Sequence, residues 1–290
     1  MIGIKKITIN KLKKKKLNHY LNKKKNFFTK FPSGGLRTKG IFKRDLKNSP
    51  LISIIMPNYK SKDLLKSMKS VLNQTYKNVE FIVVDGNSGR STIKILKKFN
   101  NKIDFWTSEN DKGMWDAWNK GFKLSRGKFV GIVDSSNILY PNAMKILAKY
   151  ILENKKIDFV CGTVKKDGKI YGGYKPNDIY RKFNIIPSSV VGFFIRRSSL
   201  NKVGLLSLKY QIQSDYDLLY RMIVKHKFKG IHTRGNEIFG DLGSSGFSKK
   251  HSFVKTLFNE AKIRLDNKQN PFIVFYIIIG RTIKRIINLI

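Results

Sequence analysis

Short apolar runs alternate with amphipathic segments in the first half of the chain. Apolar runs of strand length lie at 51–59, 80–85, 102–108, 128–134 and 158–164. Between them, apolar residues recur with a spacing near 3.6, as in 64–72 and 113–125, which is the spacing of one helix face. Strands separated by such helices predict βαβ units. We therefore expect an α/β fold with a mostly parallel, Rossmann-like sheet flanked by helices.

The second half is less regular. Its pattern predicts a hairpin at 168–174, a strand within 190–198 and a helix that starts near 214 and leads into a short strand. The segment 240–248 is rich in Gly and Ser. It is either a mobile element over a site or a plain connection.

Polar side chains follow four of the predicted parallel strands. Ligands of such sheets bind outside the carboxyl ends of the strands. Those ends read Pro57-Asn58-Tyr59, Asp85-Gly86-Asn87-Ser88, Ser108-Glu109-Asn110-Asp111 and Asp134-Ser135-Ser136-Asn137. Three of the four carry carboxylates, which suit a metal–phosphate complex, the N–H groups of a base and sugar hydroxyls better than bare phosphate.

The net charge of +40 predicts attraction to polyanions. Residues 1–48 contain 16 Lys and Arg and a single acid, Asp45, so we expect a basic N-terminal arm, either a solvated tail or a membrane-surface element. A nucleic-acid-binding module would need basic residues interleaved with aromatic ones. The aromatic residues fall mostly in predicted core strands, so no specific nucleic-acid partner is expected. The lone Cys161 suits a reducing compartment.

The segment 249–290 is expected to be helical. Its apolar run at 272–279 is too short to span a bilayer. Beyond it, one helix face gathers Ile283, Ile286, Ile287 and Ile290, and another face gathers Arg281, Lys284 and Arg285. This pattern predicts an amphipathic helix in the interface of an anionic membrane, or else a helix packed on the core. No apolar segment follows the basic start, so we expect a cytoplasmic protein, peripheral on the inner face of the membrane.

Several motifs in order resemble family 2 glycosyltransferases, especially the bacterial surface-polysaccharide branch of colanic-acid type. They are SIIMPNY (53–59), SVLNQTYKNVEFIVVDGNS (70–88), SENDKGMWDAWNKG (108–121) and SDYDLLYR (214–221). The resemblance implies a GT-A domain over 49–248, a nucleotide-sugar donor and inverting transfer to a saccharide or lipid-linked acceptor. No P-loop and no G-x-G-x-x-G turn is present, so ATPase and dinucleotide functions lack support.

The resemblance also implies roles for single residues. Asp85 corresponds to the carboxylate that accepts a hydrogen bond from an N–H group of the base. Further donor contacts are expected from Pro57, Tyr59, Ser88, Asp111, Asp116 and Asn119. For Asp111 and Asp116 the alternative is stabilisation of a helix start, and much of the role of the segment around them could be architectural.

The metal site departs from the family pattern. Relatives end the fourth strand with an acid that binds a divalent ion, and Asn137 stands there in this chain. Asp134 remains as a ligand for Mn²⁺ or Mg²⁺, with Asn137 as a weaker one. Three outcomes stay open: weak metal binding, metal-independent transfer helped by Arg196, Arg197 or Arg221, or loss of catalysis.

Asp215 is the candidate catalytic base. Inverting transfer requires a carboxylate opposite the leaving diphosphate to take the proton of the acceptor hydroxyl. Asp215 and Asp217 are two residues apart on a predicted helix, so only one of them can face the site, and the motif aligns Asp215 there. The alternative is a helix-capping charge. The leading hypothesis is therefore an inverting glycosyltransferase in surface-glycan synthesis, and the competing one is a degenerate, non-catalytic member that binds a donor or a partner protein.

Overall fold

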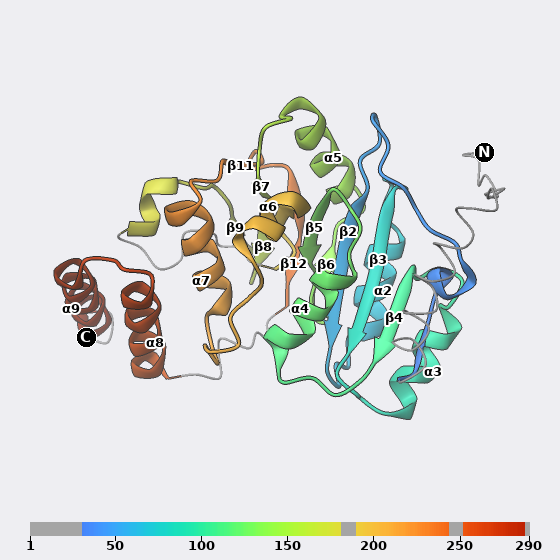
Figure 1. Cartoon of the computed structure of the whole chain (residues 1–290), viewed down its shortest axis with the longest axis horizontal. Coiled ribbons are helices and arrows are strands. Elements are labelled where there is room, and N and C mark those ends of the chain that lie inside the picture. The colour runs from blue at the N-terminus through green and yellow to red at the C-terminus, as the bar shows by residue number, and fades with distance from the viewer. Residues whose placement is uncertain (1–30, 181–189, 244–251, 288–290) are drawn as a thin grey trace, which may run out of the picture.

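The computed structural model describes residues 31–180, 190–243 and 252–287. The strands of its large sheet are β1 (Ser33–Gly34), β2 (Ile52–Asn58), β3 (Val79–Asp85), β4 (Phe105–Ser108), β5 (Phe129–Ile132), β7 (Phe159–Cys161), β10 (Phe193–Arg196) and β11 (Gly230–His232). Those of the small sheet are β6 (Ile138–Leu139), β8 (Thr163–Lys166), β9 (Lys169–Tyr171) and β12 (Ile238–Leu242). The strand order is β1-β4-β3-β2-β5-β10-β7-β11 in the large sheet and β6-β12-β8-β9 in the small one (Figure 1).

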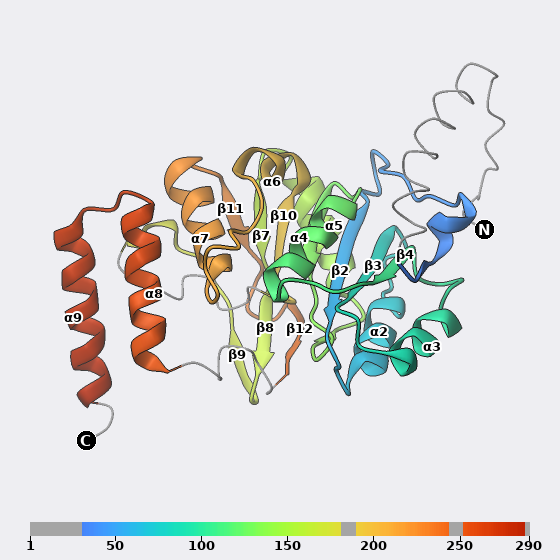
Figure 2. The same ribbon diagram turned by 60° about the horizontal axis from the view of Figure 1, so that its bottom comes forward.

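Helices cover both faces of the large sheet. The helices are α2 (Leu64–Leu72), α3 (Arg90–Lys98), α4 (Met114–Leu124), α5 (Ala143–Glu153), α6 (Arg197–Val203), α7 (Ser214–Tyr220), α8 (Phe253–Asp266) and α9 (Pro271–Ile287). Short 3₁₀ turns lie at Leu36–Lys39 and Pro176–Tyr180, and a π-helical turn at Arg221–Lys225 follows α7. Figure 2 shows α4 on one side of the sheet and α2 and α3 on the other.

Strands β2, β3, β4 and β5 are parallel, as expected, and form the centre of the fold. Successive side chains of β2 enter different cores because they alternate across the sheet. Ile54 and Met56 belong to the core beneath α2, α3 and α5, whereas Ile55 belongs to the core beneath α4, α6 and α7. Being buried on both faces, the strand is a near-continuous apolar run.

The prediction of one strand at 158–164 is wrong, because the structure divides this segment into two strands at Gly162. Residues before the glycine form β7 in the large sheet, and residues after it form β8 in the small sheet. A Cβ atom at Gly162 would lie 2.3 Å from the ring of Phe239, so only glycine allows this close approach. One chain segment thus contributes to both sheets.

The role suggested for Arg196 and Arg197 is also wrong. Strand β10 runs antiparallel to β5, and Arg196 lies opposite Phe129 at the amino end of β5. The guanidinium of Arg196 donates to the carbonyl oxygens of Ile157 and Lys155, and the main-chain N–H of Arg197 donates to the carbonyl of Lys128. Both arginines therefore sit at the edge of the sheet opposite the predicted ligand site.

Residues 31–48 of the predicted basic arm are part of the folded structure. β1 pairs with β4, and Arg37 forms an ion pair with the buried Glu80. Residues 1–30 of the arm lie outside the described residues, as do 244–248 of the predicted Gly/Ser-rich loop. The first residues of that loop, Gly240–Leu242, are instead the end of β12.

Helices α8 and α9 form a hairpin beyond α7, at the end of the molecule opposite α3 (Figures 1 and 2). The predicted helix at the end of the chain is confirmed over the described residues, with Ile290 outside them. Ile283, Ile286 and Ile287 are exposed, while Arg281 forms an ion pair with Glu260 of α8. Within the described part of the chain, no helix is both long and apolar enough to cross a bilayer.

Candidate active site

Three polar residues lie side by side at the carboxyl edge of the parallel strands. The strand register places Asn58 of β2 opposite Asp85 of β3, and Asp85 opposite Ser108 of β4. All three are buried. This edge is the ligand-binding edge predicted for the sheet.

The carboxylate of Asp85 accepts four hydrogen bonds within the protein. Its Oδ1 accepts from Asn58 Nδ2 at 2.7 Å and from Ser88 Oγ at 2.5 Å. Its Oδ2 accepts from Ser88 N at 3.0 Å and from Ser108 Oγ at 2.6 Å. A carboxylate offers about four lone-pair positions, so all of them are filled. In this structure Asp85 organises the edge of the site and is fully buried behind it.

Asn58 is the site residue that the sequence interpretation missed. Its Nδ2 is bound to Asp85, and its Oδ1 is buried without a hydrogen-bond partner among the described residues. Buried polar atoms are rarely left unpaired, so this oxygen is an acceptor with capacity for a further hydrogen bond. The signal available in the sequence was its place at the end of a buried strand, whereas its position across from Asp85 follows from the strand register.

Tyr59 lies at the rim of the same edge, directly after Asn58, which is the last residue of the buried strand β2. Pro57 is buried within that strand. The Tyr59 side chain is 66% exposed, and Lys60 Nζ lies 5.1 Å from the centre of its ring. Ser88 Oγ accepts from the main-chain N–H of Lys60 at 2.8 Å. The aromatic face of Tyr59 is thus held at the opening of the site.

The residues around the start of α4 divide between the site and the scaffold. Asp111 is half-buried against Gly86, where an added Cβ would lie 2.4 Å from Asp111 Oδ2, and this burial raises the pKa of the Asp111 carboxyl. Asp116 accepts from the main-chain N–H of Lys112 and lies 3.5 Å from Lys120 Nζ. Asn119 exchanges two hydrogen bonds with the main chain of Leu206. Asp111 therefore borders the edge formed by Asn58, Asp85 and Ser108, and Asp116 and Asn119 support the helix and the loop.

Asp134 follows β5 at the same edge of the sheet. Its Oδ1 is buried without a hydrogen-bond partner among the described residues, although the residue as a whole is partly accessible. Burial, and after it the nearby carboxyl of Asp215, raises the pKa of Asp134 to about 7. The side-chain oxygen of Asn137, unlike that of Asp134, is already paired, because Asn137 Oδ1 accepts a hydrogen bond from the main-chain N–H of Gly243 at 2.8 Å.

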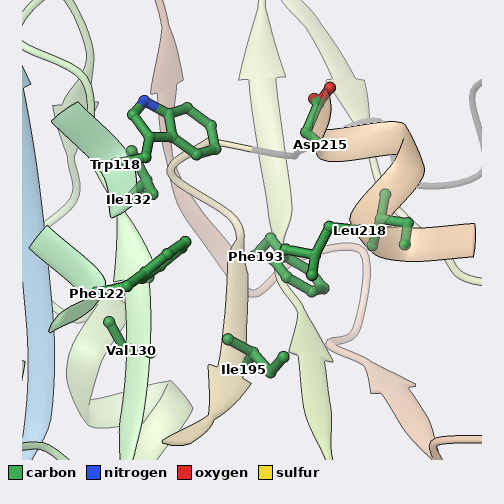
Figure 3. Close-up of a pocket in the computed structure, with 10 residues that line it drawn as sticks. Trp118, Phe122, Val130, Ile132, Phe193, Ile195, Asp215 and Leu218 are labelled. Atoms are coloured by element: carbon green, nitrogen blue, oxygen red, sulfur yellow. The ribbon is translucent and has the colours of Figure 1, made fainter. Parts of the chain in front are cut away.

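Asp215 lies in the first turn of α7. It borders a small, almost wholly apolar pocket of about 20 Å³. Figure 3 shows Asp215 and Trp118 at one end of this pocket, with Phe122, Phe193 and Leu218 below them. The indole Nε1 of Trp118 is buried and has no hydrogen-bond partner among the described residues.

Asp217 points away from this pocket into the scaffold. Its two oxygens accept from Arg221 Nε and Asn267 Nδ2, each at 2.9 Å. Arg221 also donates to the main-chain carbonyls of Val203 and Leu205. Arg221 is therefore engaged in the scaffold, which contradicts its suggested contact with phosphate.

The side chains at this edge of the sheet offer few ligands to a metal ion by themselves. Among residues 31–180, 190–243 and 252–287, no three His, Cys, Asp or Glu side chains converge as a metal site. The orphan Oδ1 of Asp134 is nevertheless a hard oxygen donor of the kind that Mg²⁺ and Mn²⁺ prefer. The residues thus fit an ion that takes one protein carboxylate and completes its shell with other ligands.

Sequence comparisons find related glycosyltransferases. A glycosyltransferase of Rickettsia typhi, named as uncharacterized, is 32% identical over 191 residues, which cover 60% of this chain and 59% of that protein. The glucosyltransferase WfgD of Escherichia coli, named for UDP-Glc and an α-D-GlcNAc-diphosphoundecaprenol, is 36% identical over 115 residues. These residues cover 39% of this chain and 45% of WfgD. This chain thus spans less than two thirds of the length of these relatives.

Solved structures share the fold. S. aureus TarS 1-349 in complex with UDP-GlcNAc superposes with a TM-score of 0.59 at 18% identity, over 79% of this chain and 70% of that one. The mannosyltransferase PcManGT of Pyrobaculum calidifontis, in complex with GDP-Man and Mn²⁺, superposes with a TM-score of 0.58 at 14% identity. The match covers 91% of this chain and 76% of that one. These neighbours confirm the expected GT-A fold. The sequence model of glycosyl transferase family 2 matches residues 53–214, more than half of the chain, so this protein belongs to glycosyl transferase family 2.

Proposed function

We propose that this protein transfers a sugar from a nucleoside diphosphate donor to a saccharide acceptor, with inversion at the anomeric carbon. The supporting observation is that a base-binding edge and a pair of acids share one rim of the sheet. Asp85 ends β3 and Asn58 ends β2. Asp134 follows β5 and lies close enough to Asp215 for the Asp215 carboxyl to raise the pKa of Asp134. The two parts adjoin, because Ser61 Oγ donates to the carbonyl of Ser135 at 2.9 Å.

The donor nucleotide is assigned to the edge formed by β2 and β3. Asn58 Oδ1 accepts a hydrogen bond from an N–H group of the base, and the exposed ring of Tyr59 packs on the base. Asp85 holds Asn58 and Ser88 in place through its four hydrogen bonds. A uracil-like or guanine-like edge, which presents such an N–H, matches this arrangement.

Asp215 is assigned the role of general base. Its carboxylate takes the proton from the acceptor hydroxyl as the hydroxyl oxygen forms its bond to the anomeric carbon. On the opposite face, the bond from that carbon to the diphosphate oxygen breaks, and the nucleoside diphosphate leaves with the electron pair. The apolar pocket below Asp215 keeps water away from one side of the carboxylate.

A divalent cation fits this reaction as a partner of the donor diphosphate. Mg²⁺ and Mn²⁺ are commonly held by one or two carboxylates together with substrate phosphates, and Asp134 would supply the carboxylate. When bound, the ion stabilises the charge that develops on the leaving diphosphate. Asn137 is assigned to hold the chain at Gly243, since its oxygen is already bonded there.

Calorimetric titration with UDP and with GDP, with and without Mn²⁺ at pH 6 and pH 8, tests the proposal. We expect one nucleotide to bind, and Mn²⁺ to strengthen its binding about tenfold more at pH 8 than at pH 6. The reason is that Asp134, with a pKa of about 7, is mostly protonated at the lower pH and must lose its proton to bind the ion. The variant Asp134→Asn should abolish this pH difference while still folding.

The outcomes of the titration separate the hypotheses. Failure of both nucleotides to bind under every condition would reject the donor site and with it the transferase function. Tight binding without transfer to any acceptor would favour the non-catalytic alternative. An equal effect of Mn²⁺ at both pH values would remove Asp134 as the ligand.

The acceptor is proposed to be a lipid-linked saccharide at the inner face of the membrane. The E. coli relative is named for a diphosphoundecaprenol-linked acceptor. The hairpin of α8 and α9 in this chain also exposes large apolar side chains, among them Phe258 (72%), Phe272 (84%) and Phe275 (66%). Lys284 and Arg285 are exposed on α9, which suits an anionic surface.

The membrane part of the proposal has its own prediction. The double variant Phe272→Ser/Phe275→Ser should bind vesicles containing phosphatidylglycerol at least tenfold more weakly than the unaltered protein, because burial of each Phe in the interface contributes about 1.5–3 kcal/mol. Co-sedimentation at fixed salt measures this, with phosphatidylcholine vesicles as the neutral surface. Ile170→Ser, an exposed apolar residue on β9, is the control and should bind as before. Undiminished binding of the double variant would exclude the hairpin as the docking surface.

A further inference from the structure

The chain segment that carries Asp215 has an unusual backbone at its start. Gln213, which directly precedes α7, has the left-handed conformation with φ 65° and ψ 24°. A residue other than glycine keeps this conformation only where its surroundings enforce it. Helix α7 has seven residues and continues into the π-helical turn at Arg221–Lys225, so its start is the end that other parts of the chain must hold.

Helix α8 holds the start of this segment. Asn259 Nδ2 donates to the carbonyl oxygen of Ile212 at 2.5 Å and to Gln213 Oε1 at 3.0 Å. One side chain of α8 therefore binds the main chain just before the left-handed residue and the side chain of that residue. These two contacts lie two and three residues before Asp215.

Helix α8 and the residue after it also hold the other side of α7. Asn267, just past the end of α8, donates through Nδ2 to Asp217 Oδ1 at 2.9 Å, and the guanidinium of the buried Arg264 lies 5.4 Å from the centre of the Tyr216 ring. Because residues two apart on a helix point in widely different directions, fixing Asp217 in the scaffold turns Asp215 away from the scaffold. Arg264 is itself bound by Glu260 and Gln269.

We propose that Asn259 and Asn267 are positioning residues that set the direction in which Asp215 acts. The inference rests on the proposed function, since it concerns the base of that reaction. Both residues lie outside the segment 53–214 that matches the family, so the C-terminal hairpin supplies part of the active-site support in this chain. The remaining face of α8, with Val254, Phe258 and Leu265, is exposed.

The test compares Asn259→Ala and Asn267→Ala with two controls, Asn236→Ala and Lys262→Ala, which change exposed residues. Each positioning variant should lower kcat 10- to 100-fold, while KM for the donor and the calorimetric affinity for UDP change less than twofold. The controls should match the unaltered protein. Adding Asn267→Ala to Asp215→Asn should cause no further loss, because a residue that acts through Asp215 has nothing left to position.

Hydrogen–deuterium exchange provides a readout that does not need activity. In Asn267→Ala, exchange should rise across residues 212–220 and stay unchanged across 52–85. An unchanged pattern at 212–220, kcat within threefold of the unaltered protein, or additive losses in the double variant would each overturn the positioning role. Absence of any transfer by the unaltered protein would instead reject the proposed function, and the exchange pattern would still decide whether α8 holds the segment.

Discussion

Replacing Asp215 with Asn should reduce kcat by about 10²- to 10⁴-fold, the usual contribution of a general base. Asp and Asn side chains have nearly the same shape, so the pocket that Asp215 borders with Trp118 and Phe122 keeps its shape. The donor nucleotide should bind with unchanged affinity, because the proposed function assigns Asp215 a contact with the acceptor hydroxyl and none with the nucleotide. Steady-state transfer assays, combined with calorimetric titration of whichever of UDP and GDP binds the unaltered protein, measure both quantities.

Two further variants make this result specific. Asp63→Asn changes an exposed acid at the start of α2 and should leave kcat unaltered. Asp217→Asn should act mainly on stability, because it removes the charge that Arg221 faces in the scaffold. If Asp215→Asn turns over as fast as the unaltered protein, the assignment of the base is wrong.

Replacing Asp85 with Ala should destabilise the protein and abolish donor binding together. The change removes the acceptor of the buried Asn58 amide, of the partly buried main-chain N–H of Ser88 and of two serine hydroxyls. Asn58 Nδ2 then keeps only Ser88 Oγ, at 3.2 Å. Each unpaired buried donor costs about 1–3 kcal/mol, and the hydroxyls recover part of this by turning, so the free energy of unfolding should fall by about 3–5 kcal/mol. Denaturant unfolding measures the loss, and titration with UDP should show affinity reduced at least 100-fold.

Ser88→Ala is the graded comparison for this site. It removes one of the four hydrogen bonds to Asp85 and the contact with the main-chain N–H of Lys60, so its effect on unfolding should be smaller. Asp85→Ala with a normal unfolding free energy and normal affinity for UDP would show that the buried cluster has neither role.

The first half of the fold could be predicted because its signals are local. Strands β2 to β5 are apolar runs and helices α2 to α5 have a clear apolar face, and each can be recognised within about ten residues. The family motifs then predicted that Asp85, Asp134 and Asp215 belong to one site. The structure brings Asp134 and Asp215 together and places Asp85 two strands away on the same edge.

The remaining features depend on contacts between distant parts of the chain. The division at Gly162 follows from the ring of Phe239, 77 positions later, and the place of Arg196 follows from a strand inserted in the opposite direction. The saturated carboxylate of Asp85 and the open oxygen of Asn58 require the strand register. None of these contacts leaves a trace in local spacing, so the sequence pattern could not predict them.

The distribution of the tryptophans has a practical consequence for experiments. Trp115 donates from Nε1 to the carbonyl of Gln211, and its ring meets that of Trp118 edge to face at 5.2 Å. The third tryptophan, Trp106, is buried in the other core and bound to Asn100. Two of the three tryptophans thus lie beside the chain that leads into α7 and carries Asp215. Ultraviolet emission, without any attached dye, should therefore follow movements of the segment that carries Asp215 when nucleotide or saccharide binds.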